Sequence, residues 1–167
     1  MSSELPRESP VPHISVVAPV YNEETATLSE LVSQLQTTLA SITGDFEIIL
    51  VDDGSRNDAW SNIVSLAQSD RRIRGIRFTR NFGQHAAIAA GIDHANGDWV
   101  VVMDSDLQDR PAVISDLYRR ANEGFDVVFV GPATRSESML YCRATGVFYR
   151  FVNFLAGHEL EYQRGNF

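Results

Sequence analysis

Carboxylates stand at three places in this sequence where they could act together. They occur in Tyr21-Asn-Glu23-Glu24, in Asp52-Asp53 and in Asp104-Ser-Asp106, and each group directly follows an apolar run. Side chains at i and i+2 of an extended segment point the same way, with a rise of about 3.3 Å per residue, so Asp104 and Asp106 can share one metal ion. Mg²⁺ and Mn²⁺ prefer oxygen ligands, and Mg²⁺ typically takes one or two carboxylates and fills its shell with water and phosphate oxygens. The spacing therefore favours a binding site for a metal ion that is coordinated by a diphosphate.

Each of these motifs also has a plainer interpretation. Asp-x-Asp pairs are common by chance, and most of them are solvated turns. Asp52-Asp53-Gly-Ser can be a turn before a helix that is capped by Ser55 or Asn57. Gln108 could add an oxygen ligand to the metal or be an ordinary loop residue.

Strands and helices alternate along the chain in an order that would bring the acids together. Apolar runs predict buried strands at 14–20, 46–51 and 99–103, a half-exposed strand at 73–79 and a further short strand at 126–130. Apolar residues at helical spacing predict helices at 28–42, 60–67, 84–95, about 111–122 with Asp109 as N-cap, and 140–155. This alternation of strands and helices predicts an α/β fold, with a mostly parallel central sheet and helices on both faces. Because ligands of such sheets bind beyond the carboxyl ends of the strands, up to six carboxylates would face one crevice, where a cation would relieve their repulsion.

Composition narrows the class of protein. The chain has 167 residues, a net charge of −8 and a single cysteine, Cys142, which suits one domain without an internal disulfide in a reducing compartment. The acidic balance argues against a nucleic-acid partner. We expect residues 1–12 to be a flexible tail, and no apolar run approaches the roughly 20 residues that cross a bilayer. The four histidines lack zinc-ligand spacing, and neither a Gly-x-Gly-x-x-Gly fingerprint nor a Walker loop is present.

Four motifs in order resemble the family 2 glycosyltransferases, which have the GT-A fold, a Rossmann-like nucleotide-sugar-binding fold. They are Ala18-Pro-Val-Tyr-Asn-Glu-Glu24, Leu50-Val-Asp-Asp-Gly-Ser55, Arg80-Asn-Phe-Gly-Gln-His-Ala86 and Val102-Met-Asp-Ser-Asp-Leu-Gln108. The last one looks closest to the polyprenyl-phosphate branch, that is, dolichol-phosphate mannosyltransferases and undecaprenyl-phosphate sugar transferases. The resemblance covers about residues 14–167 and implies one catalytic domain over 13–167, truncated at its C-terminus.

The resemblance also implies roles for individual residues. Pro19, Tyr21 and Glu23 would line the nucleoside pocket, Asp52 would accept a hydrogen bond from the base, and Asp53 would lie nearby. Asp104 and Asp106 would be the catalytic pair, with Asp104 beside the ribose and Ser105 also binding the nucleotide sugar. Asp104, Asp106 and Gln108 would hold Mg²⁺ or Mn²⁺ against the diphosphate. Arg80 would stand near the phosphates or support the acidic cluster, although a surface arginine is an equally good interpretation. Arg135 would replace an arginine that the branch usually carries a few residues earlier.

The implied reaction moves a sugar from a UDP- or GDP-sugar to a polyprenyl phosphate, with inversion, at the inner face of the cytoplasmic membrane. A phosphate acceptor is already ionised near pH 7 and needs no general base, whereas a sugar hydroxyl would need one. The aromatic segment 139–156 could contact the membrane surface or pack as a core helix. Two alternatives stay open, namely a saccharide acceptor with the same donor and a non-catalytic nucleotide-sugar-binding domain. We expect the chain by itself to bind the donor and to transfer sugar weakly or not at all.

Overall fold

The computed structural model describes residues 13–130. The chain divides into two compact units, Met1–Phe125 and Asp126–Phe167. Several of the features expected above lie outside the described residues, namely the tail 1–12, Arg135, Cys142, the helix at 140–155 and the contact segment 139–156. The described elements are β1 (Ile14–Val20), α1 (Thr25–Ile42), β2 (Phe46–Asp52), α2 (Ala59–Ser69), β3 (Ile73–Arg77), α3 (Gln84–Asp93), β4 (Trp99–Val102) and α4 (Val113–Ala121).

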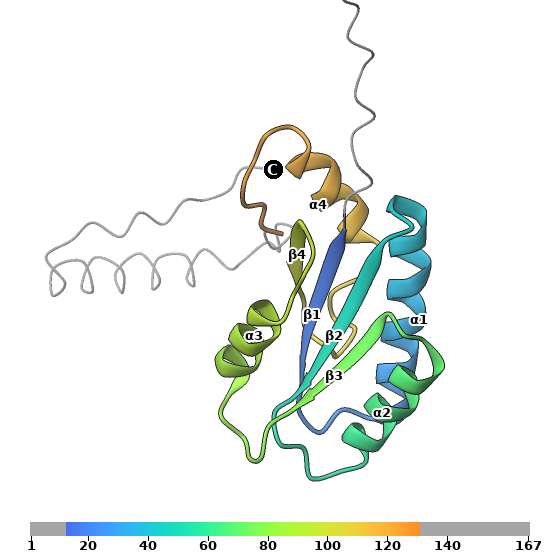
Figure 1. Ribbon diagram of the computed structural model, residues 1–167, viewed down its shortest axis with the longest axis vertical. Coiled ribbons are helices and arrows are strands. Elements are labelled where there is room, and N and C mark those ends of the chain that lie inside the picture. The colour runs from blue at the N-terminus through green and yellow to red at the C-terminus, as the bar shows by residue number, and fades with distance from the viewer. Residues whose placement is uncertain (1–12, 131–167) are drawn as a thin grey trace, which may run out of the picture. The chain divides into compact units, whose positions relative to one another are not determined.

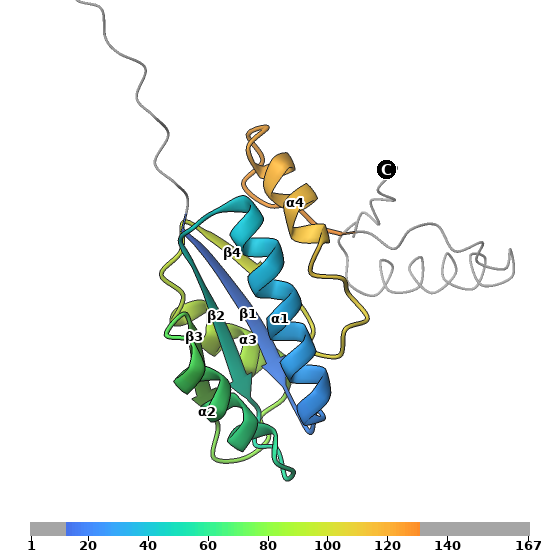
Figure 2. The same ribbon diagram turned by 90° about the vertical axis from the view of Figure 1, so that its right-hand side faces the viewer.

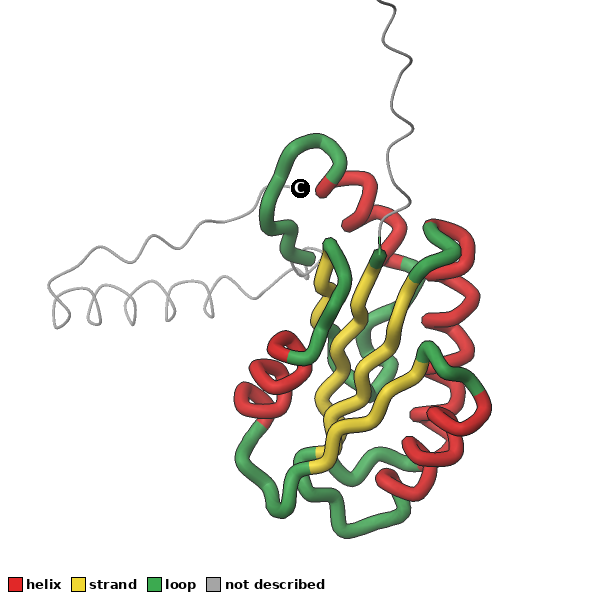
Figure 3. The backbone as a smooth tube through the Cα atoms, viewed as in Figure 1, coloured by secondary structure: helices red, strands yellow, loops and turns green. Residues whose placement is uncertain are grey.

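The four strands form one parallel sheet in the order β3-β2-β1-β4 (Figures 1 and 3). Val20 at the end of β1 is in register with Asp52 at the end of β2, and Val17 of β1 is in register with Val102 at the end of β4. The loops that follow these three strands therefore leave the same edge of the sheet. This is the arrangement that the sequence rhythm predicts.

Helices cover both faces of the sheet, as predicted (Figure 2). Alternate residues of each strand supply the two cores: Val16 and Leu50 belong to the larger cluster with α1 and α2, whereas Val17 and Val51 pack with α3. Small residues bring α3 close to the strands. A Cβ added at Gly91 would lie 2.2 Å from Cγ1 of Val17, so this position leaves no room for a side chain.

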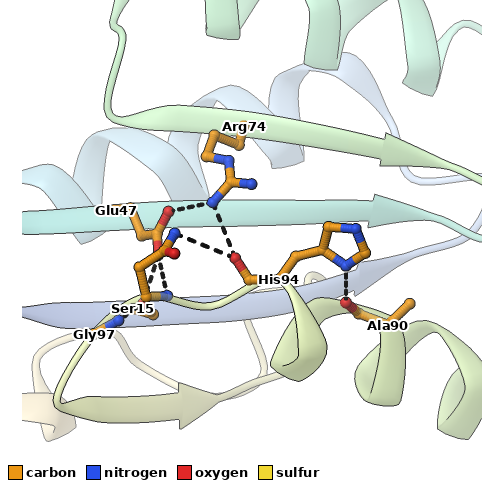
Figure 4. Close-up of polar contacts among 7 residues, drawn as sticks. Ser15, Glu47, Arg74, Ala90, His94 and Gly97 are labelled. Carbon is orange, nitrogen blue, oxygen red and sulfur yellow. Dashed lines mark hydrogen bonds and ion pairs between the residues drawn. The ribbon is translucent and has the colours of Figure 1, made fainter.

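A buried carboxylate joins the strands at the opposite end of the sheet (Figure 4). Glu47 of β2 accepts hydrogen bonds from the Ser15 hydroxyl (2.7 Å), Nη1 of Arg74 (2.7 Å) and the backbone N–H of Asn96 (2.8 Å). Burial raises the pKa of Glu47, but the hydrogen bonds from Arg74, Asn96 and Ser15 outweigh it and hold the pKa at about 2. Glu47 thus connects β1, β2, β3 and the loop before β4 at the end away from the acidic loops.

Three local predictions are wrong. Residues 126–130 form no strand, because a strand needs a neighbour to complete its hydrogen bonds, and apolar composition alone does not supply one. The strand at 99–103 is half-exposed rather than buried, with Val100 and Val102 40% and 44% exposed, because α3 packs over β1 and β2. The last described helix begins at Val113 with Ala112 as N-cap, so Asp109 does not cap it.

No helix within residues 13–130 is long and apolar enough to cross a membrane.

Candidate donor-binding site

A pocket of about 320 Å³ lies at the carboxyl edge of the sheet. It is lined by residues from the ends of β1, β2 and β4 and from the start of α3, namely Pro19, Val20, Tyr21, Glu23, Asp53, Asn81, Gly83, Gln84, Asp104, Ser105 and Asp106. Four carboxylates from three strand ends thus share one pocket. The structure brings together most of the residues that the resemblance implies, and Asp52, Arg80 and Gln108 do not line the pocket.

Hydrogen bonds connect the loop after β1 to the loop after β2. Asn22 takes a left-handed backbone conformation, with φ of 58°, and its N–H donates to Oγ of Ser55 (2.9 Å). In return, its Oδ1 accepts from the backbone N–H of Arg56 (2.9 Å), and Nδ2 of Asn57 donates to the carbonyl of Glu23 (2.9 Å). These bonds hold Tyr21 and Glu23 in place at the pocket. Ser55 therefore holds the β1 loop rather than capping α2. The N-cap of α2 is Asp58, and Asn57 just before it accepts from the N–H of Ala59 (3.2 Å).

The two adjacent aspartates at the end of β2 are both buried but have different surroundings. Asp52 is completely buried; its Oδ1 accepts from the N–H of Ser55 (3.0 Å), and its Oδ2 lies 3.3 Å from Nε of Arg77. Asp53 lines the pocket, and its two oxygens accept from the backbone N–H groups of Phe82 (2.7 Å) and Gly83 (2.9 Å). Asp53, not Asp52, is the carboxylate that faces the pocket.

Arg80 is placed by its backbone. Gly54 has a φ of 71°, and a Cβ there would lie 2.4 Å from the carbonyl carbon of Arg80, so only glycine allows the two loops to approach this closely. The Arg80 guanidinium stacks over the ring of Phe82, 4.8 Å from its centroid. The neighbouring residue Asn81 reaches the pocket wall.

The acidic loop after β4 contributes three consecutive residues to the pocket. Oδ1 of Asp104 accepts a 2.6 Å hydrogen bond from Nε2 of Gln84, and Oδ1 of Asp106 accepts from the backbone N–H of Gln108 (3.0 Å). Ser105 between them is buried and hydrogen-bonds the Glu23 side chain. The backbone thus presents both aspartates of the Asp-x-Asp motif to one pocket.

Negative charge accumulates in the pocket. Burial, and next the charge of Asp106, raise the pKa of Glu23 above its usual value. Burial, and then the charges of Asp106 and Asp109, raise the pKa of Asp104, against the hydrogen bond from Gln84. A bound cation would favour the ionised carboxylates and so lower the pKa values of both Glu23 and Asp104.

The donor atoms suit a hard divalent cation. The candidate ligands that line the pocket are carboxylate oxygens, which Mg²⁺ and Mn²⁺ prefer. Within residues 13–130, no three acidic, histidine or cysteine side chains are arranged to hold a metal by themselves. The Asp104 and Asp106 carboxylates fit a cation that takes one or two protein ligands and completes its shell with water and phosphate oxygens.

Four pocket residues have no role assigned from the sequence. Val20 is the last residue of β1, and Asn81, Gly83 and Gln84 belong to the motif at 80–86. The one sequence signal for these three residues is that their motif lies between a predicted strand and a predicted helix.

Residues 15–163 match the sequence profile described as Glycosyl transferase family 2. The undecaprenyl-phosphate 4-deoxy-4-formamido-L-arabinose transferase of Salmonella choleraesuis (strain SC-B67) is 42% identical over 132 residues, which are 78% of this chain and 40% of that protein. This chain thus spans about two fifths of the length of that relative.

Two solved structures share the fold. The mannosyltransferase PcManGT of Pyrobaculum calidifontis, in complex with GDP-Man and Mn²⁺, superimposes with a TM-score of 0.51 at 24% identity, over 57% of this chain and 28% of that chain. Residues 1–349 of TarS from S. aureus give a TM-score of 0.51 at 20% identity, over 72% of this chain and 39% of that chain. The parallel sheet, the acidic pocket and the profile match agree, and the chain belongs to glycosyl transferase family 2, with its resemblance to the polyprenyl-phosphate branch supported by the Salmonella relative.

Proposed function

We propose that this chain forms the donor-binding part of an enzyme that transfers a sugar from a nucleoside-diphosphate sugar to a polyprenyl phosphate. The observation that carries the proposal is the convergence of Glu23, Asp53, Asp104 and Asp106 on one pocket at the carboxyl edge of a parallel sheet. Membership of the family supports the sugar-transfer chemistry. The name of the Salmonella relative supports the acceptor class.

The nucleoside would bind at the β1 and β2 side of the pocket. Pro19, Tyr21 and Glu23 come from the loop after β1, and the 43% exposed ring of Tyr21 offers an apolar surface to a base. We assign the polar contact with the base to Asp53, because Asp53 lines the pocket whereas Asp52 lies outside the lining and is paired with Arg77.

The diphosphate would bind at the β4 side. Asp104 and Asp106, with Gln108 beside them, would hold Mg²⁺ or Mn²⁺ there, and the bound ion would stabilise the negative charge that develops on the diphosphate as it leaves. The same two carboxylates repel an uncompensated diphosphate, so donor binding should depend on the ion. Oδ1 of each aspartate already accepts a hydrogen bond, which orients the carboxylate before the donor arrives.

An acceptor phosphate supplies its own negatively charged nucleophile. The reaction then needs no group to remove a proton from the acceptor, and a direct attack on the anomeric carbon opposite the diphosphate inverts its configuration. A polyprenyl chain is anchored in lipid, so we place the reaction at a membrane surface. Assays with a short-chain polyprenyl phosphate against an oligosaccharide acceptor distinguish this reaction from transfer to a sugar hydroxyl.

Calorimetry with UDP and GDP, with and without Mn²⁺, tests the donor site. We expect one nucleotide to bind in the presence of Mn²⁺, and Asp106→Ala to weaken that binding by about tenfold or more, which corresponds to about 1.4 kcal/mol. Asp116→Ala is the matched control, because this α4 carboxylate is 75% exposed and lies outside the pocket lining. Nucleotide binding that is independent of Mn²⁺, or equally tight in Asp106→Ala, would count against the assigned site.

A further inference from the structure

The segment between β3 and α3 and the first residue of α3 contact acids on both sides of the pocket. The backbone N–H groups of Phe82 and Gly83 donate to the two oxygens of Asp53, which follows β2. One residue later, Nε2 of Gln84 donates to Oδ1 of Asp104, which follows β4, over 2.6 Å. This hydrogen bond is a short one for an N–H···O contact.

Gln84 extends from a backbone that is held firmly. Gly83, the N-cap of α3, has a φ of 95°, a conformation that glycine adopts without strain. Behind it, Ala87 and Gly91 are buried against the sheet. The packing of α3 and the Asp53 hydrogen bonds therefore fix the backbone from which the exposed Gln84 side chain extends.

A neutral amide suits this position chemically. An ionised carboxylate can only accept hydrogen bonds, so the amide must present its NH₂ group to Asp104. The NH₂ group orients the carboxylate without neutralising it, whereas a lysine or arginine would compete with a cation. The second oxygen, Oδ2, stays available as a metal ligand. Groups that hydrogen-bond a metal-binding carboxylate in this way fix its orientation and influence metal affinity.

We propose that Gln84 is a positioning residue for the cation site, which holds Asp104 in the orientation that binds the divalent ion. The inference rests on the proposed function, because it assigns Asp104 to that ion. It adds a residue of the motif at 80–86 to the site and gives α3 a part in metal binding.

The test is a Mn²⁺ titration at fixed UDP concentration, followed by calorimetry or by fluorescence of bound nucleotide. Gln84→Met keeps the length of the side chain and removes its donor. We expect it to raise the Mn²⁺ concentration for half-maximal UDP binding about tenfold, with the thermal unfolding midpoint of the ligand-free chain unchanged. His85→Ala is the matched control, because His85 is exposed in the same helical turn and does not line the pocket; it should titrate like the wild type.

The outcomes separate this inference from the proposed function. If Gln84→Met titrates within twofold of the wild type while Asp106→Ala loses Mn²⁺-dependent binding, Gln84 has no positioning role and the donor site stands. If Gln84→Met also lowers the unfolding midpoint of the ligand-free chain by several degrees, its role is structural and the inference is again overturned. A wild-type chain without Mn²⁺-dependent nucleotide binding would overturn both proposals.

Discussion

Replacing Glu47 by glutamine tests how the end of the sheet away from the pocket is stabilised. The difference between the ordinary pKa of 4.5 and about 2 in the folded chain, at about 1.4 kcal/mol per pH unit, corresponds to about 3 kcal/mol of stability at pH 7. Because the Arg74 side chain is 41% exposed, solvent weakens part of that interaction. We therefore expect Glu47→Gln to lower the free energy of unfolding by about 2 kcal/mol at pH 7.

The sign of the pH dependence follows from the direction of the shift. The pKa of Glu47 is lower in the folded chain than in the unfolded chain, so its contribution is present above pH 4.5 and is lost as the pH falls towards about 2. The difference in stability between wild type and Glu47→Gln should therefore shrink on acidification, to roughly half or less of its neutral value at pH 3.

Urea denaturation at pH 7, 5, 4 and 3 measures this difference. Glu30→Gln is the control, since Glu30 is an exposed carboxylate on α1; its effect should be small at every pH. Nucleotide binding by folded Glu47→Gln should match the wild type, because Glu47 lies at the start of β2 and the pocket lies beyond its end. A difference that is constant from pH 7 to pH 3 would refute the electrostatic explanation.

Two further predictions concern packing and an ion pair between the half-exposed Arg77 and the buried Asp52. Gly91→Ala should destabilise the chain by about 2 kcal/mol, because the new methyl group would lie 2.2 Å from Cγ1 of Val17; recovery of the thermal unfolding midpoint in Gly91→Ala/Val17→Ala would confirm the clash, and no recovery would contradict it. Arg77→Leu should cost about 2 kcal/mol in urea titrations, since it leaves the completely buried Asp52 carboxylate without its ion-pair partner. Adding Asp52→Asn should recover much of that loss, whereas strictly additive losses would show that the two side chains do not interact.

The fold was predictable because it follows from local patterns. Continuous apolar runs at 14–20 and 46–51 indicate strands that are covered on both faces, and both are fully buried in the structure. The strand that was predicted at 126–130 and does not form shows where apolar runs fail to predict structure. Its apolar residues favour a strand, but a strand forms only with a partner, and a single sequence does not state which segment pairs with which.

Whether Asp52 or Asp53 faces the pocket could be decided only from the three-dimensional structure. Side chains alternate along β2, so Asp52 follows Leu50 towards α2 and Arg77, while Asp53 follows Val51 towards α3. The alternation was visible in the sequence. Which face opens into the pocket was not, because that depends on α3 crossing to the side opposite α1 and α2.

The same geometry explains why the sequence alone does not indicate a role for Gln84 in the site. A glutamine at the start of a small-residue helix carries no chemical signal by itself, and its partner Asp104 lies 20 residues further along the chain. The contact exists because the start of α3 lies between the loops that follow β2 and β4, where Gly83 donates to Asp53 and Gln84 donates to Asp104. The rest of the helix is held by the packing of Gly91 on Val17 of β1. Acidic residues at strand ends can thus be identified from the sequence as a candidate metal site, whereas the neutral groups that orient them become recognisable only when the helix between the strands has been placed.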